Sequence, residues 1–135
     1  MTDHRLAGAH ELWVEGDTVC VRYHGAISVA GMEQIIAYIE AVADRIGSVF
    51  LLVDSNELVF PSVEVRRLLA ERGYARVKAQ VRFQRDFAQT AGMSVLLQNA
   101  ARLLGRPSVP TKVVETEAEA RAWLAEVRMA TGSAR

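Results

Sequence analysis

The sequence predicts an α/β fold: a single domain over residues 1–135, with a mixed β-sheet of about five strands and about four helices. Three observations predict it. Residues 11–23 read as two short strands joined by a turn, as in an antiparallel hairpin. Residues 49–53 are continuously apolar, as in a parallel strand covered on both faces. After that strand, segments with helical periodicity alternate with further strands.

The first half of the chain predicts a hairpin, a helix and a buried strand. Residues 11–14 and 18–23 are the hairpin strands, and the turn between them contains glycine. Ser28 is the expected N-cap of the first helix, and Gly47 stands where its C-terminal cap is expected. The strand at residues 48–54 follows directly. The helix has one apolar face, formed by Met32, Ile35, Ile36, Ile39, Ala43 and Ile46.

The middle of the chain predicts a second helix and a fourth strand. Pro61 and Ser62 open the helix, and Gly73 ends it. Residues 75–84 alternate strictly between apolar and polar side chains, which predicts a strand with one polar face toward an edge of the sheet. The alternative is a helix that continues past Gly73, so this boundary stays open.

Two more helices and one strand complete the expected fold. The spacing of apolar residues predicts a third helix over about residues 87–104. Residues 111–115 form the fifth strand. Thr116 and Glu119 have the spacing of a capping box, so the final helix begins there. We expect the core of the domain to span residues 10–128, with frayed termini.

Composition excludes several classes of protein. The single Cys20 rules out a disulfide within the chain and suits a reducing compartment. No apolar run approaches the roughly 20 residues needed to cross a bilayer. The N-terminus lacks the apolar core of a signal peptide. We therefore expect a cytoplasmic protein without a transmembrane segment.

The charge is balanced overall but unevenly distributed. Residues 1–61 carry three basic and nine acidic groups, a net charge of −6, and residues 62–106 carry nine basic and three acidic groups, a net charge of +6. Such asymmetry indicates an anionic partner or self-association, unless folding mixes the charges on one surface. We favour mixing, because sequence segments are not surface patches. Nucleic acid is disfavoured, because no known binding module is present and the alternation assigns the nearby Phe83 to the core.

The chain contains the strand end FLLVDSNELVFPS, the helix VEVRRLLAERG and the ending VVETEAEARAWL. In this order the three segments resemble the STAS domain family, in particular the small stand-alone bacterial proteins similar to anti-sigma-factor antagonists (SpoIIAA-like). The resemblance implies a regulatory, protein-binding domain. In that family a buried strand ends in Asp, an apolar loop follows, and a regulatory phosphoserine opens the next helix. Asp54, Phe60 and Ser62 stand at or near these positions.

The regulatory site departs from the family pattern. The family usually has Asp-Ser-Ser-Gly, whereas this chain has Phe-Pro-Ser-Val, so the preceding Asp and the following Gly are both missing. Ser62 is therefore either a phosphoacceptor or an N-cap whose hydroxyl accepts a backbone hydrogen bond. We favour the cap, because serine is common at this position of a helix and the flanking motif is incomplete.

Five other residues are candidates for partner binding. Asp54 and Ser55 lie at the strand end, Phe60 lies in the loop, and Arg66 and Arg67 face outward from the second helix. A carboxylate at a strand end either binds a metal, acts as a base or accepts hydrogen bonds from its own loop. We favour the last role for Asp54, because a metal needs more ligands at set spacing.

No catalytic set, metal site or cofactor is predicted. The histidines, at positions 4, 10 and 24, lack metal-ligand spacing. Cys20 and His24 lie four residues apart on one strand, roughly 13 Å along it, and cannot form a catalytic pair there. Phosphate-binding glycine motifs and nucleophile motifs are absent from the sequence.

The leading functional hypothesis is a non-enzymatic, STAS-like regulatory or protein-interaction domain that docks a protein partner, or a second copy, near residues 54–62 and the second helix. The alternative is a domain that binds a lipid or small molecule in an apolar pocket under the helix at residues 87–104. An enzyme is disfavoured, because no catalytic residues converge in the sequence.

Overall fold

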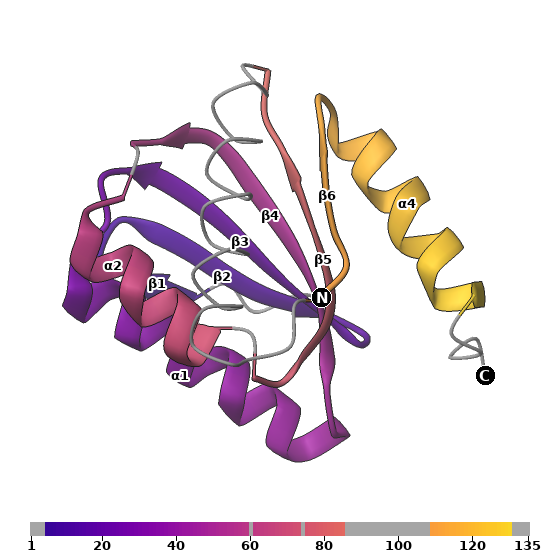
Figure 1. Cartoon of the computed structure of the whole chain (residues 1–135), viewed down its shortest axis with the longest axis horizontal. Helices are drawn as coiled ribbons and strands as arrows, with labels where there is room; N and C mark the ends of the chain where they lie inside the picture. The colour runs from indigo at the N-terminus through magenta and orange to yellow at the C-terminus, as the bar shows by residue number, and fades with distance from the viewer. Residues whose placement is uncertain (1–4, 60, 74, 86–108, 131–135) are drawn as a thin grey trace.

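A six-stranded sheet organises the chain in the computed structural model, which describes residues 5–59, 61–73, 75–85 and 109–130. The strands follow the order of the sequence across the sheet (Figure 1). β2 is antiparallel to both β1 and β3, and β4, β5 and β6 run parallel to β3. The strands are β1 Arg5–Ala7, β2 His10–Glu15, β3 Thr18–Gly25, β4 Val49–Leu58, β5 Val77–Phe83 and β6 Thr111–Val114.

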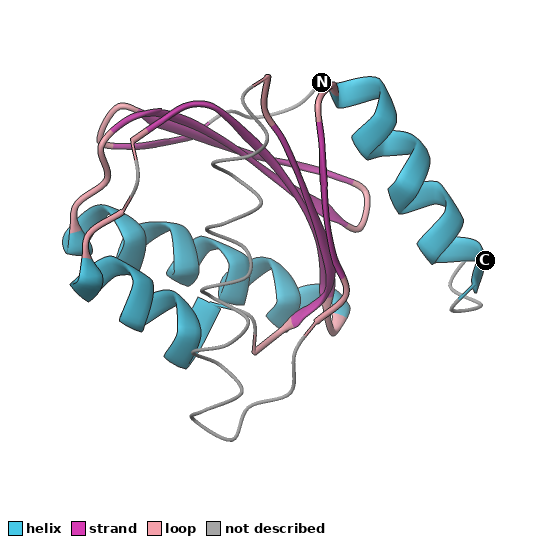
Figure 2. Cartoon of the chain, turned by 45° about the horizontal axis from the view of Figure 1, so that its top comes forward, coloured by secondary structure: helices cyan, strands magenta, loops and turns pink. Residues whose placement is uncertain are grey.

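The described helices cover the two faces of the sheet. They are α1 Val29–Ile46, α2 Val63–Leu68, the π-helix η1 Leu69–Gly73 and α4 Glu117–Ala130. Figure 2 shows α1 and α2 on one side of the sheet and α4 on the other. The predicted α/β fold with a mixed sheet is confirmed. The predicted helix at residues 87–104 lies outside the described residues, as does the pocket expected beneath it.

The sheet has one strand more than predicted. β1 is only three residues long and pairs with β2, opposite Leu12, Glu11 and His10. Gly8, with φ 64°, supplies the left-handed turn between the two strands. In a strand this short only Ala7 is buried, so no alternating pattern marked it in the sequence.

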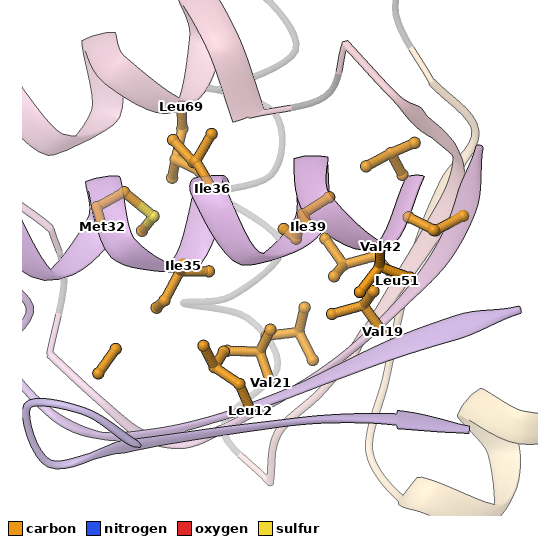
Figure 3. Close-up of a cluster of buried hydrophobic side chains, with 14 of the residues drawn as sticks. Leu12, Val19, Val21, Met32, Ile35, Ile36, Ile39, Val42, Leu51 and Leu69 are labelled. Atoms are coloured by element: carbon orange, nitrogen blue, oxygen red, sulfur yellow. The ribbon is translucent and has the colours of Figure 1, made fainter. Parts of the chain in front are cut away.

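The strand β4 is buried on both faces, as its apolar run predicts. Phe50 and Leu52 belong to the core under α4, whereas Val49, Leu51 and Val53 belong to the core under α1 and α2. Figure 3 shows the core under α1 and α2. Ile35 and Val42 of α1 point toward the strands, and Ile36 points toward Leu69 of η1.

β4 is longer than predicted. Hydrogen bonding continues past Asp54 to Leu58, where the sequence suggested a loop. Between Asp54 and Glu57, β4 has one residue more than β3 has between Arg22 and His24. A bulge absorbs that extra residue and lets the pairing resume. The polar residues at this end therefore stand on a strand, in fixed register with β3.

Of the polar side chains predicted on one face of β5, Lys78 is exposed, whereas Gln80 and Arg82 are buried. Gln80 is 1% exposed and Arg82 is 2% exposed, and β6 lies beyond β5 in the sheet. The amide of Gln80 donates to the hydroxyl of Thr111 on β6 at 3.3 Å, so a polar side chain is accommodated by a sideways hydrogen bond. The second helix does end at Gly73, and the alternative of a continuing helix is therefore wrong.

Phe50 tests the dependence of the fold on β4. Phe50→Ala removes a ring with 0% exposure from the centre of the sheet. We expect it to lower the free energy of unfolding by about 3–5 kcal/mol, through lost burial and an unfilled cavity. Urea denaturation followed by circular dichroism measures this loss. The exposed Val63→Ala is the control and should change stability by no more than about 0.5 kcal/mol. Equal effects of the two changes would contradict the central role of β4.

Candidate functional site

Polar residues from three strands meet where β3 and β4 end. We call Glu11, Arg22, His24, Asp54 and Glu57 the strand-end network. Arg22 Nε lies 3.2 Å from Asp54 Oδ2, and Arg22 Nη1 lies 3.7 Å from Glu11. His24 lies between two carboxylates, with Nε2 2.6 Å from Glu11 and Nδ1 3.1 Å from Glu57. The network therefore ties β2, β3 and β4 together at one end of the sheet.

Asp54 has a structural role within this network. Its Oδ1 accepts hydrogen bonds from the backbone N–H and the side-chain amide of Asn56, both at 3.1 Å. Its Oδ2 accepts from Arg22. Both oxygens are therefore engaged by neighbours within the chain. The sequence suggested the local hydrogen bond, but it gave no signal for Arg22, which lies 32 residues away.

Behind the network, His10 is buried and is held by the backbone. Its Nδ1 accepts the backbone N–H of His24 at 3.0 Å, and its ring meets Tyr23 edge-on, with 5.5 Å between the ring centroids. Burial lowers the pKa of His10, and the neighbouring His24 lowers it further, against a hydrogen bond with the backbone of Ala26 that raises it. The neutral ring therefore suits this position.

The pKa of His24 shifts in the opposite direction. Its hydrogen bond with Glu11 raises the pKa most, and the hydrogen bond with Glu57 raises it further. The two carboxylates thus favour the protonated ring. Two histidines that are joined by one hydrogen bond consequently titrate on opposite sides of their common ordinary value.

Both α1 and α2 begin at this same end of the molecule (Figure 1). Ser28 caps α1 by accepting the backbone N–H of Gly31 at 3.0 Å, and Ser62 caps α2 by accepting that of Val65 at 3.2 Å. Ser62 is also exposed to solvent. The hydroxyl therefore fills the structural role that the sequence favoured, at a position that solvent reaches.

An exposed apolar group surrounds these helix starts. Val59 and Val63 are each 54% exposed, and Val29 is 40% exposed. The backbone N–H of Val59 donates to the carbonyl of Gly25 at 3.3 Å, which joins the loop after β4 to the end of β3. We call the set the helix-start surface, composed of Val29, Val59, Ser62, Val63 and Arg67.

The remaining predicted site residues differ in how far solvent reaches them. Ser55 is 0% exposed, so its side chain lies inside the protein. Ser55 lies on β4 rather than in a loop, at the bulge between Asp54 and Glu57. Arg67 is exposed and Arg66 is half-buried. Phe60 lies outside the described residues.

The uneven charge of the sequence is partly paired within the fold. Arg72 lies 3.1 Å from Glu40, and Arg76 lies 2.8 Å from Asp44 on α1. Arg76 also donates to the carbonyl of Gly47 at 2.8 Å, and so caps the C-terminus of α1. Basic groups of the middle segment thus lie against acidic groups of the first segment, as expected for charges that mix on folding.

A small pocket lies between the sheet and the start of α4, and Arg22 and Asp54 of the strand-end network help to line it. It has a volume of about 10 Å³, roughly the space that one water molecule needs. This is smaller than the roughly 300–1,000 Å³ of typical ligand sites. Burial raises the pKa of the Cys20 thiol to about 12, so it is protonated and unsuited to nucleophilic attack. The lining residues are Trp13, Cys20, Val21, Arg22, Leu52, Asp54, Phe83 and Glu117.

The part of the chain that the structure describes contains neither a metal-binding cluster nor a membrane-spanning helix. No group of three or more His, Cys, Asp or Glu residues there is arranged to hold a metal ion. None of the helices there is long and apolar enough to cross a membrane.

Comparison with known proteins identifies the family. A profile of the SpoIIAA-like family matches residues 18–125. The chain belongs to the SpoIIAA-like family. The same fold occurs in an uncharacterised DUF3478-family protein from Shewanella loihica PV-4, which has a SpoIIAA-like fold. The two are 17% identical, with a TM-score of 0.61 over 92% of this chain and 95% of the other.

The remaining comparisons add no functional information about this SpoIIAA-like chain. A structure described as Mglu is 18% identical over 78% of this chain and 19% of the other. Its TM-score of 0.39 supports no conclusion. No curated protein matched the chain. The resemblance stated from the sequence is therefore confirmed for family and fold.

The two histidines predict opposite effects of pH on stability. His24 stabilises the folded state fully below its ordinary pKa, and that contribution is lost as the pH rises through the raised value. His10 stabilises it above its ordinary pKa, and that contribution is lost as the pH falls through the lowered value.

Urea unfolding between about pH 5 and pH 9 measures both effects. The stability lost in His24→Gln should shrink as the pH rises. The loss in His10→Gln should grow over the same range. Parallel pH profiles for the two variants would show that the network does not control the titration.

Proposed function

We propose that the protein is a non-enzymatic regulatory domain that binds a protein partner through the helix-start surface. The observation that carries this proposal is the exposure of Val29, Val59 and Val63 around the starts of α1 and α2. Burial of these side chains against a partner would remove apolar area from water, at about 25 cal/mol per Å². The surface also contains the exposed hydroxyl of Ser62 and the charge of Arg67.

The framework behind this surface supports a binding role. The strand-end network holds the ends of β3 and β4 together, and the Val59 to Gly25 hydrogen bond fixes the loop that carries the valine. A surface fixed in advance loses less conformational freedom when a partner binds. The network thus supports recognition by holding the surface in place.

The described titratable groups favour binding over catalysis. Asp54 is occupied by Arg22 and Asn56, and His24 is occupied by Glu11 and Glu57. A general base needs a substrate proton within reach, whereas these groups face one another. Cys20 is held as a buried thiol. This pattern supports a non-enzymatic protein, and the cytoplasmic location expected from composition stays a prediction.

The proposal also includes regulation of partner binding at Ser62. Ser62 is exposed at the start of α2, and the family resemblance supports a regulatory role for a serine at or near this position. A negative charge added there changes the electrostatics of the surface next to Arg67 while remaining compatible with the helix start.

Valine-to-aspartate changes test the binding surface. A tagged chain should capture a protein partner from its native extract, and Val63→Asp should weaken the binding of that partner at least about tenfold by placing a charge in an apolar contact. Ile46→Asp is the matched control, because Ile46 is 49% exposed at the C-terminal end of α1, away from the surface. Equal loss in both variants, or no loss in either, would refute the surface. A change in the native mass of the chain alone would identify a second copy as the partner.

Serine variants test regulation separately. Ser62→Ala removes the cap and should cost about 1 kcal/mol of stability, measured in urea, while partner binding persists. Ser62→Glu should alter the affinity for the captured partner. If the two variants bind that partner equally well, Ser62 is only a cap. Intact mass of the native protein before and after phosphatase treatment reports whether the serine is modified.

A further inference from the structure

The helix α4 makes a narrow apolar contact with the sheet. Among its fourteen residues only Ala120 and Leu124 are buried, and Trp123 and Val127 are partly buried. Met129 is 74% exposed. Figure 2 shows α4 alone on its side of the described sheet, opposite α1 and α2. Two buried side chains are a small apolar anchor for a helix of this length.

Two arginine forks supplement that anchor. Arg121 donates from both terminal nitrogens to Glu15, at 2.8 and 3.3 Å. Arg128 donates to both oxygens of Asp17, at 2.8 and 3.2 Å, and also to the hydroxyl of Thr18 at 3.1 Å. Bidentate pairs of this kind fix geometry as well as adding attraction. Both carboxylates lie beside the turn between β2 and β3. The two arginines therefore hold α4 against a hairpin that is more than one hundred residues away in the sequence.

The surface beneath α4 is apolar and contains the single thiol of the chain. Cys20 is 1% exposed, Phe50 0% and Val81 0%. The guanidinium of Arg128 also lies over the ring of Phe50, 4.8 Å from its centroid. Burial raises the pKa of Cys20, so the covered thiol is protonated and unreactive. The reactivity of this thiol therefore reports whether α4 is in place.

We propose that α4 is a displaceable strap, which opens when the Arg121 and Arg128 forks separate and uncovers the apolar sheet face around Cys20 while the α1–α2 side stays folded. This conformational device lies on the face of the sheet opposite the helix-start surface and is independent of the proposed function. The larger of the two described cores lies under α1 and α2, and α4 contributes nothing to it. Local opening of a weakly anchored element therefore requires less free energy than global unfolding.

The opening responds to ionic strength. The side chains of the Arg121–Glu15 pair are 43% and 36% exposed, and those of the Arg128–Asp17 pair are 29% and 35% exposed. Salt screens charges that solvent reaches, because the Debye length falls to about 3 Å near 1 M salt. Added sodium chloride should therefore weaken both forks and leave the apolar anchor in place.

Alkylation of Cys20 by iodoacetamide in the native full-length chain tests the strap. The rate, followed by intact mass, should be far below that of a free thiol. It should rise with sodium chloride and depend on urea less steeply than global unfolding does. Arg121→Gln and Arg128→Gln should each accelerate labelling about two- to fivefold.

Arg72→Gln is the matched control. It removes an exposed ion pair with Glu40 on the other side of the sheet and should leave the labelling rate unchanged. Urea curves recorded for each variant separate local opening from lost global stability. Labelling that follows global unfolding in every variant would overturn the proposal. Fast labelling that ignores both salt and the arginine changes would also overturn it, because the reagent would then reach Cys20 without movement of α4.

Discussion

Burial of β4 on both faces is the constraint on which the remaining structure depends. Phe50 and Leu52 need a helix on one side, and Leu51 and Val53 need helices on the other, so a single strand requires three layers. The parallel pairing with β3 also requires a crossover helix, which α1 supplies. The starts of α1 and α2 consequently meet at the carboxyl end of β4, where open α/β sheets usually carry their functional residues.

Charged side chains hold different elements together at the two ends of the sheet. At the end of β4 the strand-end network pairs acids and bases from three neighbouring strands, and so fixes backbone that would otherwise fray. Beside the β2–β3 turn, Glu15 and Asp17 hold a helix more than one hundred residues away in the sequence. Exposed pairs stabilise little individually. Their value here is that they determine which segments lie together.

Local patterns carried most of the fold. Alternation, helical spacing and capping residues marked α1, β4, the Ser62 cap and α4, because those signals depend on near neighbours in the chain. The sequence failed where tertiary context decides. Nothing in a three-residue strand distinguishes β1, and burial of Arg82 depends on what covers β5. The network around His24 was missed because its partners come from β2 and β4, and only the register brings them together.

The two outermost described strands carry a consequence of their own. β1 has three residues and β6 has four, on either side of longer strands. These short edges offer few backbone groups with which a neighbouring chain could pair to extend the sheet. Many natural proteins use short edge strands to avoid edge-to-edge aggregation. The shortness of the described edge strands thus protects the sheet from edge-to-edge pairing with a neighbouring chain.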